Sequence, residues 1–265
     1  AYDRMYQPVH TINEIDYNAK TDYWVPFREN ILPQSDQISV GWKNYTNEHL
    51  TLSIEAYYKS MRNLLLIRNL EYYLDAHSDY AQGKGVSMGV EFMAEYGRGA
   101  FTGWVSYTLS QSRRTFGGRS YPFKYDAPHD LSAFAGYVVR RKPTNTHTLS
   151  LQMQFKSGYP YYVPEVSYLG MGLPTFPNGY IETNGDLFEV HHVPPYPNIR
   201  LKNYFRADIN YTVERKLKHG GLTWQFSLLN VTNRANSYAV YKKDGRYKAF
   251  VLIPVLPSIS VKRSF

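Results

Sequence analysis

Hydrophobic and polar residues alternate along most of this chain with a repeat of two. In the segment 50–69, for example, Leu52 and Ile54 share one phase, whereas Ser53 and Glu55 share the other. Successive side chains of a β-strand point to opposite faces, so this repeat predicts strands. The pattern predicts about ten of them. They are residues 1–6, Ser35–Lys43, Leu50–Asn69, Met88–Tyr96, Phe101–Ser110, His129–Arg141, His147–Gly158, Phe205–Glu214, Leu222–Tyr241 and Phe250–Phe265.

The connections between these strands alternate between short and long. Short turns are expected at 44–48, 97–100, 142–146 and 217–221, and longer connections at 7–34, 70–82, 116–128 and 159–200. Asp244-Gly245 is a tight hairpin dipeptide before the last strand. An antiparallel meander sends alternate connections to opposite ends of the sheet. One end should therefore carry tight turns and the other long loops, which is typical of outer-membrane barrels.

The two phases of the strands differ in charge. The apolar phase has no charged residue near the strand centres, whereas the opposite phase carries Glu55, Glu91, Glu95, Lys156, Arg206, Asp208 and Glu214. A Lys or Arg side chain at the bilayer midplane costs about 2–4 kcal/mol, so a lipid-facing phase should be free of charge. The pattern favours an all-β, antiparallel up-and-down transmembrane β-barrel, with the charged phase facing its lumen.

Composition agrees with this fold class. The chain is 43% hydrophobic and 16% aromatic, with 26 Tyr residues, and its mean hydropathy is −0.47. It has no apolar run long enough for a transmembrane helix, but barrel strands alternate and average to a polar hydropathy. The absence of cysteine excludes disulfides and thiolate metal sites. The net charge of +8 is scattered and accompanies no nucleic-acid motif, so we expect no nucleic-acid partner.

The ends of the sheet suggest that the barrel needs further strands. The final strand should pair antiparallel with Leu222–Tyr241 on one side, but residues 1–6 are too short to pair with it on the other. The chain also starts without an initiating Met or a signal peptide. We therefore expect residues 1–265 to be the C-terminal part of one barrel domain whose first strands precede Ala1.

Catalytic chemistry has one candidate set. His129, Asp130 and Ser132 could be combined as a nucleophile and base, as in an outer-membrane hydrolase. Adjacent strand residues point to opposite faces, however, and no nucleophile motif such as G-x-S-x-G is present. The simpler interpretation is that Asp126 and His129 fix the start of a strand through local hydrogen bonds. We expect no enzyme activity and no cofactor.

Ligand-binding candidates lie in the long connections. Aromatic rings there could stack on a sugar or an aromatic ligand, or pack on one another. Glu189, His191 and His192 could ligate a metal or a siderophore, although they also suit a solvated loop, and we expect no metal site. The ligand-binding candidates are Trp24, Tyr159, Tyr161, Tyr162, Tyr168, Phe176, His191 and His192.

An ordered series of short motifs resembles a known family. It includes Trp24-Val25-Pro26, Gly83-Lys84-Gly85, Gly103-Trp104-Val105-Ser106-Tyr107-Thr108-Leu109-Ser110, Tyr121-Pro122 and Asn230-Val231-Thr232-Asn233-Arg234. Together these resemble the C-terminal part of a TonB-dependent outer-membrane receptor of the Bacteroidetes type that carries a carboxypeptidase-regulatory-like domain. Phe265 resembles the terminal aromatic residue of that family, whereas Arg263 stands where the family usually has another aromatic residue.

The resemblance implies a 22-stranded plugged barrel, of which this chain would be the last ten strands. It implies energy-coupled uptake of a scarce nutrient, such as a siderophore, cobalamin, a peptide or a glycan, across the bacterial outer membrane. The implied partners are the plug domain, the missing strands, a TonB-type energy-transducing complex, outer-membrane lipid and lipopolysaccharide, and in some cases a surface lipoprotein. The implied plug-facing residues are Glu55, Glu91, Glu95, Arg206, Asp208 and Glu214. The alternative is a soluble or surface-exposed β-protein that binds a glycan or a protein.

Overall fold

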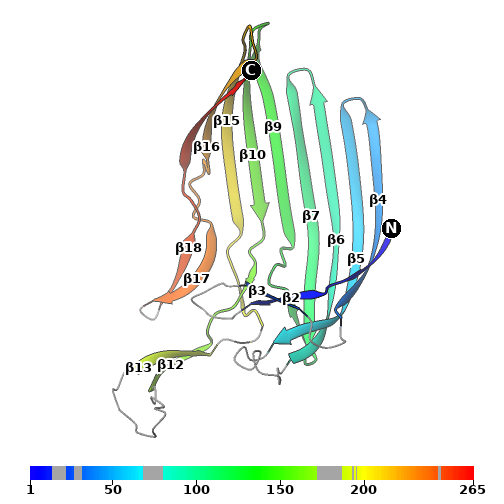
Figure 1. The fold of residues 1–265 in the computed structure, drawn as a ribbon, viewed down its shortest axis with the longest axis vertical. Helices are drawn as coiled ribbons and strands as arrows, with labels where there is room; N and C mark the ends of the chain where they lie inside the picture. Colours follow the sequence, from blue (N-terminus) through cyan, green and yellow to red (C-terminus); the bar gives the residue numbers. More distant parts are fainter. Residues whose placement is uncertain are drawn as a thin grey trace.

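The computed structural model describes residues 1–13, 22–26, 32–67, 80–171, 187–192, 194, 196–243 and 246–265. Within these ranges the regular structure is entirely β (Figure 1). None of the described segments forms a helix with the length and hydropathy that a membrane crossing would need.

One curved antiparallel sheet of 11 strands dominates the molecule. Ten of its strands follow one another in chain order, and β8 (Arg119–Pro122) pairs with β7 off this path. The ten are β1 (Tyr2–Tyr6), β4 (Gln34–Asn47), β5 (Leu50–Ile67), β6 (Tyr80–Arg98), β7 (Phe101–Phe116), β9 (His129–Arg141), β10 (Asn145–Lys156), β15 (Tyr204–Lys216), β16 (Gly221–Leu229) and β19 (Leu256–Ser264). The predicted all-β antiparallel meander is thus confirmed, as is the pairing of the final strand with the strand that begins near residue 222.

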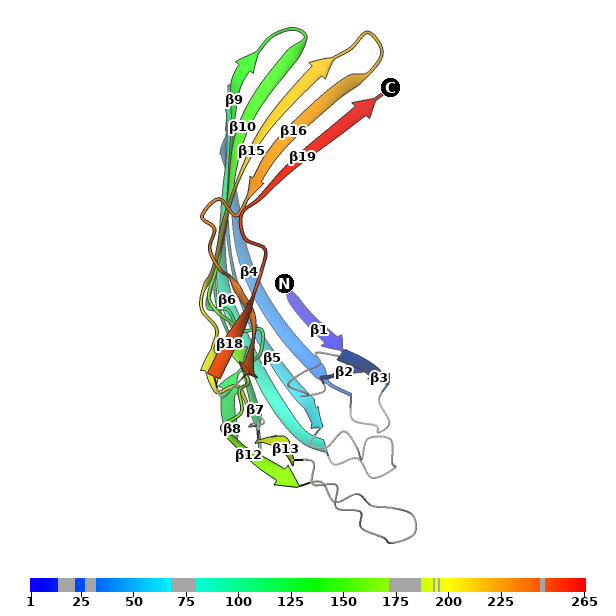
Figure 2. The same ribbon diagram turned by 90° about the vertical axis from the view of Figure 1, so that its left-hand side faces the viewer.

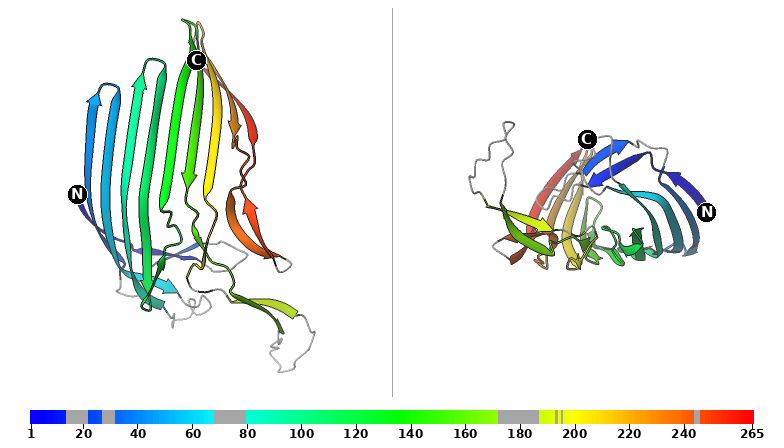
Figure 3. Two further views of the ribbon diagram at one scale, coloured as in Figure 1. Left: turned by 180° about the vertical axis from the view of Figure 1, so that it is seen from behind. Right: turned by 90° about the horizontal axis from the view of Figure 1, so that it is seen from below.

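Four two-stranded ladders lie in the long connections. They are β2 (Val9–Asn13) with β3 (Asp22–Pro26), β11 (Pro160–Tyr161) with β14 (Ile199–Arg200), β12 (Val166–Met171) with β13 (Leu187–His192), and β17 (Ser237–Lys243) with β18 (Arg246–Val251). All four belong to the end of the sheet opposite the short turns (Figure 1). The β2–β3 hairpin lies on the concave side of the sheet (Figures 2 and 3).

The sheet is an open arc when seen along its strands (Figure 3). Among the described residues, β19 pairs only with β16, and β1 covers only Gln34–Ile38 of β4. Ser39 is still bonded to Ala1, and the remaining backbone groups along both edges, including those of Val40–Asn47 that point away from β5, are thus available for further strands.

The ladder register separates the side chains into two faces of opposite chemistry. One transverse row over seven strands is wholly apolar: Trp42, Ile54, Phe92, Tyr107, Leu131, Phe155 and Phe205. The next row, one residue along and on the other face, is Gly41, Glu55, Glu91, Thr108, Asp130, Lys156 and Tyr204. We call these the apolar face and the polar face.

The apolar face is the more exposed of the two. Val40 is 71% exposed, and Ser39 beside it on the polar face is only half-buried. Likewise Tyr58 is 49% exposed whereas Tyr57 is half-buried. Side chains diverge on the convex side of a curved sheet and converge on the concave side, so this alternation indicates that the apolar face is convex.

No second layer packs on the apolar face among the described residues. Apart from a few prolines such as Pro194, the buried apolar side chains in this part of the chain are Met61, Val163 and Ala207. A soluble half-buried sheet shows the reverse pattern, with apolar residues covered and polar residues in water. The large exposed apolar surface therefore requires a covering that the described residues do not supply.

The predicted strand Leu222–Tyr241 is wrong as one element, because the chain leaves the ladder at Asn230. Asn230 is 2% exposed and adopts φ 51°, the left-handed region in which Asn is favoured over most residues. Its side-chain amide donates to Arg234 O and Ile253 O, both at 3.1 Å. Its backbone N–H donates to Asp208 Oδ1 at 2.8 Å. These bonds replace the sheet ladder, so β16 ends at Leu229.

The predicted start of the last strand at Phe250 is wrong for the same reason. Leu252 N–H donates to Asn236 O, and Val255 N–H donates to Asn233 Oδ1. The backbone between β18 and β19 is thus bonded by the Asn230–Asn236 bend rather than by a neighbouring strand. The predicted Asp244-Gly245 turn lies outside the described residues, but Lys243 and Arg246 on either side are paired in the β17–β18 ladder.

Candidate functional site

The candidate site lies where the long connections meet, at the lower end of the sheet in Figure 1. The connections after β7 and β10 meet there around one buried ion pair. Arg200 Nη2 lies 2.7 Å from Asp126 Oδ2, and Asp126 is only 4% exposed. The other carboxylate oxygen of Asp126 accepts the Ser112 backbone N–H at 2.7 Å. One carboxylate therefore joins β7 to β14.

Arg200 also binds backbone. Its Nη1 donates to Asp126 O at 2.9 Å and to Gly158 O at 2.8 Å. A guanidinium group presents several donors in a fixed plane, so it can tie separate segments in one geometry. Arg200 lies in β14, and it holds this strand to the loop before β9 and to the chain just after β10. This cross-link shapes the floor of the loop region.

Aromatic rings gather beside this cross-link. Their centroids form two series: Phe116, Tyr121 and Tyr196 at separations of 6.3 and 6.2 Å, and Phe123, Tyr125 and Tyr159 at 5.4 and 6.5 Å. We call these six rings the aromatic cluster. It draws its members from β7, β8, the loop before β9 and both ends of the 157–203 connection.

Cationic side chains lie over several of these rings. The Arg114 guanidinium carbon is 4.1 Å from the Phe123 centroid, and that of Arg119 is 3.7 Å from the Tyr196 centroid. Arg114 fits against β6 because Gly85 faces it, where a Cβ would lie 2.8 Å from Arg114 Nη1. Cation–π contacts of this kind contribute about 0.5–2 kcal/mol each. The surface therefore combines flat apolar rings with positive charge.

Of the predicted ligand-binding residues, Tyr159 belongs to this cluster, and Tyr161 and Tyr162 follow it in the same connection. Burial raises the pKa of Tyr162 to about 12, and the nearby Tyr121 acts in the same direction. Tyr162 therefore remains a neutral phenol throughout the physiological pH range. Tyr161 pairs with Ile199, and its hydroxyl donates to Val240 O at 3.3 Å, which connects β11 to β17.

The other predicted ligand-binding residues lie elsewhere. Tyr168 is 58% exposed on the β12–β13 hairpin, where Ser167 pairs with His191 and Val166 with His192. Trp24 pairs with Thr11 in the β2–β3 hairpin. Phe176 lies outside the described residues. Of the described members of the predicted set, Tyr159 alone belongs to the aromatic cluster, and the others occupy separate elements.

The possible catalytic residues do not form a relay. His129 Nδ1 lies 2.8 Å from the Tyr107 hydroxyl, whereas Asp130 pairs with Lys156 Nζ at 2.7 Å on the opposite face. The predicted local bonds of Asp126 and His129 reach further than expected. Asp126 binds Ser112 and Arg200, and His129 N–H donates to the Ser157 hydroxyl at 3.1 Å.

The register puts the predicted plug-facing residues on one side of the sheet, the polar face. Glu55 pairs directly with Glu91, and Glu95 lies four residues further along β6 toward the short turns. Arg206 and Asp208 form an ion pair at 2.9 Å. Asp208 is 3% exposed and accepts the Asn230 backbone N–H, so its first role is to hold the bend after β16.

Sequence reasoning did not single out Arg114, Arg119, Phe123, Tyr125, Tyr196 or Arg200 as site residues. The signal for some of them was the run Tyr121–Tyr125, where three aromatic residues alternate with Pro122 and Lys124 in a connection between strands. Within the described ranges no group of three His, Asp or Glu residues could hold a metal ion.

No protein-family model matches the chain, and no curated protein matches it.

Proposed function

We propose that this chain is the C-terminal part of the barrel of a TonB-dependent receptor in the bacterial outer membrane. The observation that carries the proposal is how side chains are distributed over the sheet. Its convex, exposed face is apolar, and its concave face holds the charges, which is the reverse of a soluble half-buried sheet. A lipid environment favours this arrangement, since hydrocarbon is the one solvent in which a continuous exposed apolar face is stable. The resemblance of the motif series supports the family.

The dimensions of the sheet also support the proposal. A tilted strand needs about 9–11 residues to cross a bilayer, and β5, β6 and β7 have 18, 19 and 16. The surplus extends toward the long connections. Open edges cannot face lipid, because their backbone groups would be unsatisfied. The remaining strands would come from another part of the protein and close the barrel between β1 and β19.

In this proposal the polar face lines the lumen and meets a plug domain, and the long connections face the cell exterior. The aromatic cluster and its arginines would contact the transported nutrient. Rings that stack and cations that attract suit a ligand with planar and anionic groups. Uptake would require an energy-transducing complex acting on the plug, and the exterior loops would lie among lipopolysaccharide or against a surface lipoprotein.

Fractionation of cells that express the full-length protein tests the proposal. We expect the protein in the outer-membrane fraction, resistant to carbonate or urea washing and released by detergent, because the apolar face stays in lipid. Recovery of the folded protein in aqueous buffer without detergent would contradict the proposal. It would favour a soluble or surface β-protein whose apolar face is covered by a second sheet.

A further inference from the structure

The face that carries the apolar rows ends in a set of cations toward the long connections. On β6 the phase of Val90 reaches Lys84, and Val86 in the same phase pairs with Arg113 of β7. The register puts two further arginines on this face, one on β1 and one on β5. We call these four cations the basic rim: Arg4, Arg62, Lys84 and Arg113.

Asp36 of β4 lies among these cations and positions two of them. Its Oδ1 accepts from Arg4 Nε at 2.6 Å, and its Oδ2 accepts from Arg62 Nη2 at 2.5 Å. Oδ1 also accepts the Tyr2 hydroxyl group at 2.7 Å. The side chains of Arg4 and Arg62 remain 47% and 56% exposed. Because two arginines share one carboxylate, this part of the rim keeps a net positive charge at the surface.

The other half of the rim has no acidic partner among the described residues. Lys84 is exposed, and it pairs with Thr115, two residues along β7 from Arg113. Arg113 donates from Nε to the Ser120 hydroxyl group at 3.2 Å and from Nη2 to Ser120 O at 3.1 Å. Neighbouring cations repel one another, and a bound anion removes that repulsion. This half of the rim therefore favours an anionic ligand.

The basic rim lies at the depth where lipid headgroups would begin. On β6, the side chains of residues 86–96 that share this face are uncharged, and Lys84 and Arg98 flank them. This run has the length of about 9–11 residues that a tilted strand needs to cross a bilayer. Tyr2 and Tyr58, between the apolar rows and the rim, are 58% and 49% exposed, and tyrosine is enriched at membrane–water boundaries. The rim would therefore meet headgroups rather than acyl chains.

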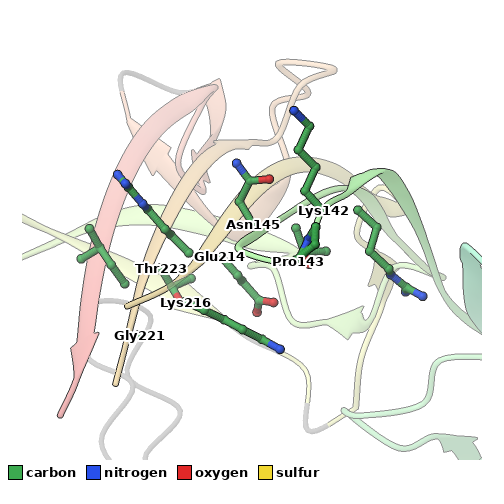
Figure 4. Close-up of a pocket in the computed structure, with 11 residues that line it drawn as sticks. Lys142, Pro143, Asn145, Glu214, Lys216, Gly221 and Thr223 are labelled. Atoms are coloured by element: carbon green, nitrogen blue, oxygen red, sulfur yellow. The ribbon is translucent and has the colours of Figure 1, made fainter. Parts of the chain in front are cut away.

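The cations of the short-turn end are spread more widely. Around the cavity between the β9–β10 and β15–β16 turns, Lys142 and Lys216 point away from each other (Figure 4). On the apolar face itself, Arg98 and Arg140 lie on strands that β7 separates. The basic rim instead has cations on three adjacent strands, β5, β6 and β7. A ligand with several negative charges is thus better matched by the rim.

We propose that the basic rim binds the phosphates of lipopolysaccharide in the outer leaflet, through its phosphorylated glycolipid part. Arginine can bind two phosphate oxygens at once, and lysine adds a point charge. From β1 to β7 the rim extends over four strand spacings, about 19 Å in all. A headgroup with a phosphate at each end of a disaccharide engages more of this width than the single phosphate of a phospholipid. The acyl chains then lie against the apolar face.

The lipid site and the candidate ligand site are on different sides of the sheet. Arg113 and Arg114 are adjacent in sequence and point to opposite faces of β7, and Arg114 is the one that lies over Phe123 of the aromatic cluster. The proposal rests on the proposed function, because it requires the apolar face to be in lipid and the long connections to face the exterior. It adds a lipid partner that the transported nutrient does not involve.

The test uses the full-length protein in neutral detergent and native mass spectrometry, which counts bound lipids. Lipid A with two phosphates, its monophosphoryl form and phosphatidylglycerol are added at equal concentrations. We expect lipid A to be retained about tenfold better than phosphatidylglycerol, with the monophosphoryl form between them. Lys84→Gln/Arg113→Gln should lose this preference. Lys84→Arg/Arg113→Lys keeps both charges and should retain lipid A within about threefold of the wild type.

The matched control is Arg98→Gln/Arg140→Gln, which removes two exposed cations from the same face at the short-turn end and should leave lipid A retention unchanged. Equal losses in this control and in Lys84→Gln/Arg113→Gln would overturn the proposal, because binding would then follow net charge alone. Unchanged retention in Lys84→Gln/Arg113→Gln would also overturn it. If the protein enters phosphatidylcholine nanodiscs but shows no preference for lipid A, only this inference fails. If it enters no bilayer, the proposed function fails as well.

Discussion

Replacing Val90 with lysine is expected to prevent stable insertion of the full-length protein into membranes. Val90 lies on the apolar face between Ala56 and Leu109 and is 40% exposed. A lysine at bilayer depth on a lipid-facing surface costs about 2–4 kcal/mol. The folded, membrane-inserted fraction should fall by about 30-fold or more in refolding into phosphatidylcholine vesicles at intermediate urea concentration.

Thr108→Lys is the matched control for this substitution. Thr108 is adjacent in sequence to Leu109, pairs with Glu91, and lies on the polar face at nearly the same depth. A lysine there meets Glu91 and an aqueous lumen, so insertion should change by less than about threefold. Similar losses for Val90→Lys and Thr108→Lys would mean that both faces are buried in protein, and the assignment of the apolar face to lipid would be wrong.

Replacing Asp126 with alanine is expected to loosen the loop segments that the Asp126–Arg200 pair joins, without unfolding the sheet. The change removes the carboxylate that accepts from Arg200 Nη2 and from the Ser112 N–H. Loss of one partner of a buried pair costs about 3–5 kcal/mol. Because the Arg200 side chain is 37% exposed, we expect the lower end of this range. Amide hydrogen exchange at residues 157–161 and 196–203 should then speed up by about 100-fold.

The Asp126–Arg200 pair can be separated from a general loss of stability by a double-mutant cycle. Asp126→Ala and Arg200→Ala should each accelerate exchange, and the double substitution should add little, because both remove the same contact. Lys202→Ala is the control, since Lys202 is exposed and makes no ion pair among the described residues. Additive effects would show that the two residues stabilise the loops independently.

The order of the strands in the sheet follows from local sequence pattern. Period-two alternation is decided within each strand, and the short turns are set by a few residues, such as Gly99 with its φ of 64°. The ten-strand order was therefore predictable. The curvature, the open edges and the short ladders within the connections were not, because they depend on contacts between distant segments and on strand registers that no local pattern fixes.

The errors at the C-terminal end have a specific origin. The apolar run from Phe250 to Val255 has the composition of a strand, and local propensity alone predicts one. Three asparagines from another segment bond this run: Asn230 and Asn233 through their side chains, and Asn236 through its backbone O. Tertiary hydrogen bonds thus override propensity, and the motif that first looked like a family landmark is the structural reason for the break.

The candidate site was less predictable than the fold. Asp126 and Arg200 are separated by 74 positions, and neither residue has a local pattern that reports the other. The same holds for Arg119 and Tyr196, which meet across two connections. Aromatic enrichment did indicate the end of the molecule that holds the aromatic cluster, because the predicted Tyr159 belongs to the cluster and Tyr162 lies near Tyr121. It could not identify which rings stack, since stacking depends on how the connections fold back.

The central claim, that the apolar face meets lipid, can be tested residue by residue because the chain has no cysteine. With any cysteine outside residues 1–265 replaced by serine, single cysteines at Val90, Glu91 and Phe92 of the full-length protein in vesicles would carry a polarity-sensitive fluorophore. We predict that lipid-borne quenchers reduce fluorescence at 90 and 92, and that aqueous iodide acts mainly at 91. The side chains alternate between the two faces of β6, so the environments should alternate too. Quenching that is uniform, or strongest at 91 from lipid, would contradict the account.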